Sequence, residues 1–418
     1  MFRKSLTLTV LGMLVLSSLL VMPIFAQENW LVYFFNNKYE SKELIRVKAD
    51  GSQETYPLGA GQLAYINSDA MAFTSDGKYV AFCAFELDTL PVPTKTTTTV
   101  YVRDIAAQSN LLALPSTHCE MGHSAWSTDS QLLAISQLND YPGDGEVNLD
   151  TTQPTWQLQI LDARSGEVKY ELNQQSPIIA AYDTLAKNSV IARVRQFDNH
   201  HLIFAALAYS NPVPSTLHWE GYQWNLDTNT VTAMLMWANE GVDVLPATGE
   251  TVYAAKDPDR AGAISLIATL PNLPDNNVIK IINASGEERT IFHTTDWIVK
   301  DVKFIDDGTR VMIQLGAPLD PNTIAQPDKW IALDRAGHTE DLDSSYQVAV
   351  AAPGGYLSLY NAYDPQVTGS FVTTTWTYHH DGQSNDLFRS GVGAAESLTL
   401  AWVTPSVASD QLPPFPAI

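Results

Sequence analysis

The sequence lacks the short motifs by which many enzymes are found. It contains no G-x-S-x-G elbow, no H-E-x-x-H pair, no P-loop and no dinucleotide-binding fingerprint. This absence argues against the hydrolases, metalloproteases and nucleotide-dependent enzymes that those motifs define. It does not exclude an enzyme that draws single catalytic residues from distant parts of the chain.

Basic residues are also scarce, with 24 Lys and Arg against 46 Asp and Glu in 418 residues. Cleavage of a signal peptide after residue 26 would remove two of the basic residues and leave a formal charge of −24. A surface so negative repels nucleic acid and anionic lipid, so neither is expected as a partner. It favours cationic partners or divalent metals, although solubility alone also explains it.

Hydrophobic segments of membrane-spanning length are absent after residue 26. Before that point, Arg3 and Lys4 precede the mostly apolar stretch Leu6–Val21, and the small residue Ala26 ends the region. This pattern is typical of a secretory signal peptide, residues 1–26, and the alternative is an uncleaved membrane anchor. We therefore expect an exported protein, periplasmic or extracellular, with no stable membrane insertion after cleavage.

Only two cysteines are present, Cys83 and Cys119. In an exported chain, two cysteines indicate one disulfide. One alternative is a pair of buried thiols that pack as small apolar residues. Another is a zinc site that combines Cys119 with His118 and His123, but three such residues so close together have poor geometry without a distant fourth ligand.

No helix of ten or more residues is predicted, and short strand patterns recur instead. The clearest unit is Met71–Phe85, in which two strand-like segments flank the turn Ser75–Gly77. Asp-Gly in this turn is a strong hairpin signal because Gly adopts positive φ without strain. Six full units of four strands, A to D, are predicted, with A–B turns at 75–77, 127–130, 198–200, 246–249, 306–308 and 353–355.

An acid or amide follows most of the predicted C strands, as at Asp104, Asp162 and Asp334. Such residues readily accept hydrogen bonds from the backbone of their own turn. We predict that role for them, because equivalent turns of separate repeats cannot all belong to one active site.

Each end of the chain contains part of a further unit. Residues 30–58 supply B, C and D strands, and Ser397–Val403 is a surplus strand. We therefore predict an all-β fold, a seven-bladed β-propeller of four-stranded antiparallel blades, with six or eight blades as alternatives. The ring would be closed by pairing the N-terminal strands with the C-terminal strand, which removes exposed sheet edges. The propeller domain would span residues 27–405, followed by a Pro-rich tail at 406–418.

The repeated segments resemble the TolB-like or WD40-like β-propeller repeat, in which S-P-D-G-K precedes a strand of the type I-A-F. Met71–Phe82 matches this pattern well and Phe304–Met312 moderately, and Leu44–Ser52 resembles the family's L-Y-V-x-D-x-D-G-S segment. The resemblance covers nearly all of residues 30–403. It implies a propeller and the broad class of binding scaffolds, and it supplies no site residues.

The connections between the B and C strands are long, and in a four-stranded meander all of them leave on one face. They hold 13 of the 23 prolines and 13 acids. Long loops on a rigid scaffold often carry binding sites, although neutral loop expansion is an equal alternative. The aromatic candidates for stacking on a peptide or sugar are Tyr141, Tyr209, Trp219 and Tyr363.

One of these connections is a candidate calcium loop. Closely spaced carboxylates and glycines suit Ca²⁺, a hard cation that takes several oxygen ligands. The alternative is a solvated acidic loop, because Pro142 and Thr151 stand where an EF-hand needs ligands. The candidate ligands are Asp140, Asp144, Glu146 and Asp150. No other cofactor is predicted.

Two functions remain from the sequence. The first is an exported, non-catalytic binding or scaffold protein, a monomer that holds a protein, peptide or glycan on the face with the long B–C connections. The second is a propeller-type hydrolase or lyase with a metal in its central channel. We favour the first because no catalytic constellation is visible.

Overall fold

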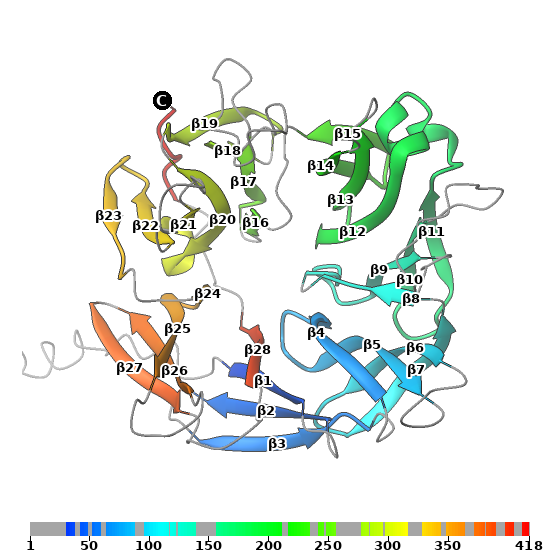
Figure 1. Cartoon of the computed structure of the whole chain (residues 1–418), viewed down its shortest axis with the longest axis horizontal. Helices are drawn as coiled ribbons and strands as arrows, with labels where there is room; N and C mark the ends of the chain where they lie inside the picture. Colours follow the sequence, from blue (N-terminus) through cyan, green and yellow to red (C-terminus); the bar gives the residue numbers. More distant parts are fainter. Residues whose placement is uncertain are drawn as a thin grey trace, which may run out of the picture.

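The chain forms a ring of seven four-stranded antiparallel sheets, the blades of a β-propeller (Figure 1). This confirms the predicted all-β, seven-bladed architecture. The computed structural model describes residues 31–37, 42–48, 52–59, 64–87, 96–116, 118–122, 124–138, 156–210, 216–234, 241–245, 248–255, 277–283, 285–295, 297–316, 328–343, 348–363, 372–380, 382–389, 398–404 and 412–417. The predicted signal peptide, residues 1–26, lies outside these residues.

Blades I to VI follow the order of the chain, and blade VII combines its two ends. The A strands, innermost in the ring, are β4 (Ala64–Phe73), β8 (His118–Glu120), β12 (Ser189–Phe197), β16 (Val242–Leu245), β20 (Ile298–Ile305), β24 (Val348–Ala352) and β28 (Leu398–Val403). The B strands are β5 (Tyr79–Leu87), β9 (Leu132–Leu138), β13 (His201–Ser210), β17 (Glu250–Ala255), β21 (Arg310–Gly316), β25 (Gly355–Tyr363) and β1 (Leu31–Asn37).

The outer half of each blade consists of its C and D strands. The C strands are β6 (Thr96–Asp104), β10 (Trp156–Asp162), β14 (Thr216–Asn225), β18 (Val278–Ile282), β22 (Lys329–Asp334), β26 (Val372–His380) and β2 (Lys42–Lys48). The D strands are β7 (Ser109–Ser116), β11 (Val168–Asn173), β15 (Thr230–Met234), β19 (Glu288–His293), β23 (Thr339–Asp341), β27 (Gln383–Arg389) and β3 (Gln53–Pro57). The short helical turns are η1 (Pro177–Ile179), η2 (Thr184–Asn188) and η3 (Asp306–Gly308). Among the described residues, no helix is both long and apolar enough to span a membrane.

The ring closes in blade VII, where β28 pairs antiparallel with β1. The register joins Val32 to Val403 and Phe34 to Leu400. Val32 and Phe34 are fully buried, and they pack with Trp376 of the neighbouring blade VI in one apolar cluster. The predicted closure by the two chain ends is therefore confirmed.

Local side-chain chemistry explains the tight A–B turns. In blade I, Thr74 Oγ1 donates to Asp76 Oδ1 at 2.6 Å, and the Lys78 amide donates to the same oxygen at 3.0 Å. Gly77 completes the turn with a φ of +64°. The carboxylate thus replaces the partners that the turn backbone would otherwise lack.

The acids after the C strands also bind their own turns, as predicted. Asp162 Oδ1 accepts the amides of Arg164 and Ser165 at 3.1 and 2.8 Å. Asp334 Oδ1 accepts two amides of its turn, each at 2.8 Å. Backbone hydrogen bonds of this kind lower the pKa of both carboxyl groups. These acids are turn residues of separate blades.

The two cysteines form a disulfide between blades I and II, which confirms that prediction. Cys83 lies on β5 and Cys119 on β8, with Cα atoms 6.0 Å apart. Both residues are fully buried within the cluster that joins blades I, II and III. The bond therefore fixes one blade against the next inside the core.

A pair of truncations tests the closure. A chain that ends at residue 396 lacks β28, so β1 loses its partner at the five paired positions from Val32 to Asn36. We expect it to aggregate or to lose its cooperative thermal transition, because an open sheet edge invites pairing with other chains. A chain that ends at residue 404 keeps β28 and should remain a folded monomer. Size-exclusion chromatography and thermal melting compare the two chains. A stable monomer of the chain that ends at residue 396 would show that pairing of β1 with β28 is not needed to close the ring.

Candidate functional site

The sheet order gives the ring two different faces. The A–B and C–D turns lie on one face, called here the turn face. The B–C connections leave from the opposite one, called here the connection face. The predicted segregation of tight turns from long connections follows directly from these antiparallel meanders. Any site built from one set of loops therefore has a rigid seven-part base.

The candidate calcium ligands cannot be placed on either face. Asp140, Asp144, Glu146 and Asp150 all lie outside the described residues, as does Tyr141. Calcium binding by this loop stays a prediction. Among the residues that the structure does describe, no group of three or more His, Cys, Asp or Glu side chains is placed to hold a metal ion.

The other three aromatic candidates lie near the connection face by backbone register. Tyr209 pairs with Leu217 near the end of the β13–β14 hairpin, and Trp219 pairs with Leu207 two positions further in. Both belong to blade III. Tyr363 is the last residue of β25 in blade VI, three blades further round the ring. The backbone brings Tyr209 and Trp219 onto adjacent strands and leaves Tyr363 on a separate blade.

Polar side chains on neighbouring A strands are joined between blades. Arg193 on β12 donates to both carboxylate oxygens of Glu120 on β8, at 2.5 and 3.1 Å. The Phe304 amide of β20 donates to Asp243 Oδ2 of β16 at 2.9 Å. Desolvation between these strands raises the pKa of Asp243, and the Lys303 ammonium opposes the shift. These groups bind one another across blade boundaries.

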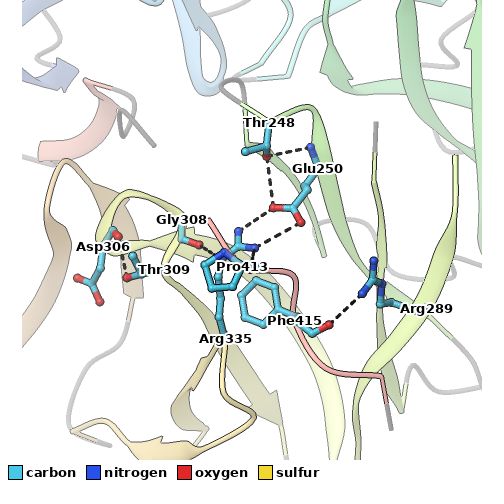
Figure 2. A network of polar contacts seen from close by, with 9 residues as sticks. All are labelled: Thr248, Glu250, Arg289, Asp306, Gly308, Thr309, Arg335, Pro413 and Phe415. Atoms are coloured by element: carbon cyan, nitrogen blue, oxygen red, sulfur yellow. Dashed lines mark hydrogen bonds and ion pairs between the residues drawn. The ribbon is translucent and has the colours of Figure 1, made fainter. Parts of the chain in front are cut away.

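A polar network of the described residues lies on the turn face between blades IV and V (Figure 2). Arg335, in the turn after β22, donates from Nη2 to Glu250 Oε2 at 2.7 Å, while its Nε donates to the Gly308 carbonyl at 2.8 Å. The Arg335 and Glu250 side chains are 5% and 12% exposed. Thr248 Oγ1 also donates to the Glu250 carboxylate, at 3.3 Å. The ion pair is thus buried, and each partner has a further hydrogen bond, Arg335 to Gly308 and Glu250 to Thr248.

The C-terminal segment, Leu412–Ala417, is docked on this network, beside β19 and β20 in Figure 1. Phe415 is 1% exposed and belongs to the apolar cluster of blades IV and V. The Arg335 guanidinium lies over its ring, 4.4 Å from the centroid. Arg335 Nη1 donates to the Pro413 carbonyl at 2.6 Å, and Arg289 Nη1 donates to the Phe415 carbonyl at 3.2 Å.

Two glycines of the surrounding turns leave room for this segment. A Cβ on Gly337 would lie 3.1 Å from Pro416. One on Gly308 would meet Leu245 first, at 2.5 Å, and then Leu412 of the segment at 3.1 Å. Both glycines have positive φ, +82° and +87°, so a larger residue would also strain the turn. We call the set Glu250, Arg289, Gly308 and Arg335 the clasp site. The prolines of residues 406–418 predict only an extended tail, so this site was not predicted from the sequence.

No family model matches the chain, and no curated protein matches it either. Solved structures with a similar fold include the acylaminoacyl peptidase of Pyrococcus horikoshii, at 12% identity and TM-score 0.49; the match covers 83% of this chain and 48% of that one. The β-propeller domain of the Trilobed protease from Pyrococcus furiosus matches at 14% identity and TM-score 0.47, covering 83% and 87%. TolB from Acinetobacter baumannii matches at 12% identity and TM-score 0.43, and the match covers 91% of this chain and 69% of that one.

The chain spans about half the length of the Pyrococcus horikoshii peptidase that it matches. At these identities and TM-scores the similarities carry no argument about activity. The sheets and their order define the class without them: this is a β-propeller protein of seven blades, closed by its own two ends.

Substitution of Arg335 tests the buried ion pair. Arg335→Met leaves the Glu250 carboxylate buried without its guanidinium partner, so we expect the free energy of unfolding to fall by about 3 kcal/mol. The variant Arg335→Met/Glu250→Gln removes both charges and should recover part of that loss. Urea denaturation measures both proteins. Equal losses in the two would show that packing of Arg335 on Phe415, rather than the charge pair, stabilises the site.

Proposed function

We propose that this protein is an exported, non-catalytic binding propeller whose partner, a protein, peptide or glycan, binds on the connection face. The observation that carries this proposal is the difference between the two faces. On the turn face, carboxylates of the short turns accept hydrogen bonds from the amides of the same turns. Residues 412–417 already occupy the clasp site there. The connection face is where loops of greater length leave the rigid ring, the usual location of binding residues.

Long B and C strands support this assignment. In blade III, β13 and β14 are paired over ten positions, out to Ser210 and Thr216. In blade VI, the pairing of β25 with β26 continues to Tyr363 and Val372, four residues beyond the last partner of β24. These hairpins extend past their A strands toward the connection face. They supply regular backbone on which a contact surface could be held in place.

Charge and compartment point to the kind of partner. The chain has a formal charge of −22, and the six connections contain 13 Asp and Glu. Such a surface attracts cationic partners and increases their rate of encounter. The disulfide between Cys83 and Cys119 suits an oxidising compartment, which supports export.

The aromatic candidates provide the first test. The mature protein is screened against a glycan array and a displayed peptide library, and the best ligand is titrated against Tyr209→Ala/Trp219→Ala/Tyr363→Ala. Loss of large aromatic contacts at the centre of an interface should weaken binding at least about tenfold. Tyr170→Ala, an exposed aromatic on the outer strand β11, is the matched control. Equal effects of the two variants, or none, would contradict the proposed face.

Metal analysis separates this function from the alternative, a hydrolase or lyase with a metal in the channel. Three acids of the A strands already bind groups of the chain: Glu120 binds Arg193, Asp243 accepts the Phe304 amide, and Asp301 accepts the Val302 amide. We therefore expect no stoichiometric metal in the mature protein and the same thermal midpoint with and without chelator. One metal per chain, with a lower midpoint in chelator, would overturn the proposal in favour of the metal-dependent function.

A further inference from the structure

The clasp site holds the C-terminal segment by contacts that do not require a covalent connection to the ring. Two arginines donate to main-chain carbonyls, those of Pro413 and Phe415. A single aromatic ring, that of Phe415, is buried between the blades. All of these contacts are with residues 412–417, and a free peptide of the same sequence could make each of them.

The sequence of the segment matches the chemistry of the site. Proline has no N–H and a nearly fixed φ, so the stretch Pro413–Pro416 is preset for an extended form whose main-chain carbonyls still need donors. Arg335 and Arg289 supply those donors. The Arg335 guanidinium also covers the face of the Phe415 ring, a favourable cation–π arrangement. Proline-rich segments are generally recognised through their preformed extended backbone; here the two arginines bind that backbone, and the apolar cluster of blades IV and V takes the Phe415 ring.

The site is prepared by the ring without help from the segment. Arg335 is bound by Glu250 of blade IV and by the Gly308 carbonyl of blade V, both independent of residues 412–417. Glu250 is in turn bound by Thr248. A guanidinium already oriented loses less conformational freedom when a peptide binds, so the affinity of the site for that peptide is higher.

We propose that the clasp site is a binding site for extended peptides that carry a phenylalanine between prolines. The chain's own C-terminal segment is its tethered occupant. This site lies on the turn face and is independent of the function proposed for the connection face. A partner protein with a Pro-Pro-Phe-Pro segment would bind here by displacing residues 412–417.

The covalent link between residues 412–417 and the ring determines how well a free peptide can compete for the clasp site. A short linker gives its attached segment an effective concentration in the millimolar range. A free peptide therefore competes poorly with the intact C-terminus and binds well only when that segment is weakened. The substitution Phe415→Ala weakens it by removing the buried ring while leaving the arginines of the site intact.

The experiment uses a fluorescein-labelled peptide with the sequence of residues 411–418, QLPPFPAI. Its anisotropy is measured with the full-length mature protein and with full-length Phe415→Ala. The variant should bind at least about tenfold tighter than the wild type. The same peptide with alanine in place of phenylalanine should not bind, and neither should the labelled peptide bind to Phe415→Ala/Arg335→Met. Absence of binding to Phe415→Ala, or equal binding of the two peptides, would overturn the proposal.

A second measurement covers the case in which Phe415→Ala does not fold. A protease recognition sequence replaces part of residues 405–411 in the otherwise wild-type chain, which is folded and then cleaved. The labelled peptide should then exchange with the cleaved segment in a saturable manner. Failure to exchange, or loss of the segment without rebinding of the peptide, would overturn the proposal.

Discussion

The pairing of β28 with β1 is the constraint on which the rest of the structure depends. It brings the two ends of the chain into one blade, so every blade has a neighbour on each side. Blades are joined by specific contacts as well as apolar packing. Trp126 Nε1 donates to the Ala72 carbonyl at 3.0 Å between blades II and I, and Trp156 Nε1 donates to Ser189 Oγ at 2.7 Å between blades II and III. These contacts fix consecutive blades against each other within the closed ring.

The order of strands within each blade makes the two faces of the propeller different in kind. On the turn face, the carboxylates of Asp76 and Asp162 accept hydrogen bonds from the backbone of their own turns. Contacts of longer range lie between blades IV and V, where Arg335 binds Glu250, Gly308 and the Pro413 carbonyl of the C-terminal segment. The hydrogen bonds of single turns form within one blade, whereas the clasp site needs residues of two adjacent blades.

Most of the fold was predictable from the sequence because the relevant signals are local. An Asp-Gly turn between apolar segments specifies a hairpin from its own φ preferences and hydrogen bonds, and repetition of the hairpin implies a propeller. The incomplete units at the two ends predicted blade VII, and the two cysteines predicted the disulfide. For the connection face, the sequence supplied candidates such as Tyr209 and Trp219, but their chemistry depends on which side chains meet across loops.

By itself, then, the sequence determined the strands, their turns and the way the ring closes, since these follow from backbone preferences and alternating hydrophobicity over a few residues. Only the tertiary structure decided the clasp site. Arg335 and Glu250 are 85 positions apart, and Arg289 and Phe415 are 126 apart. Prolines in residues 406–418 indicate an extended chain and nothing about its neighbours. Burial of Phe415 depends on the packing of two blades, which no local pattern encodes.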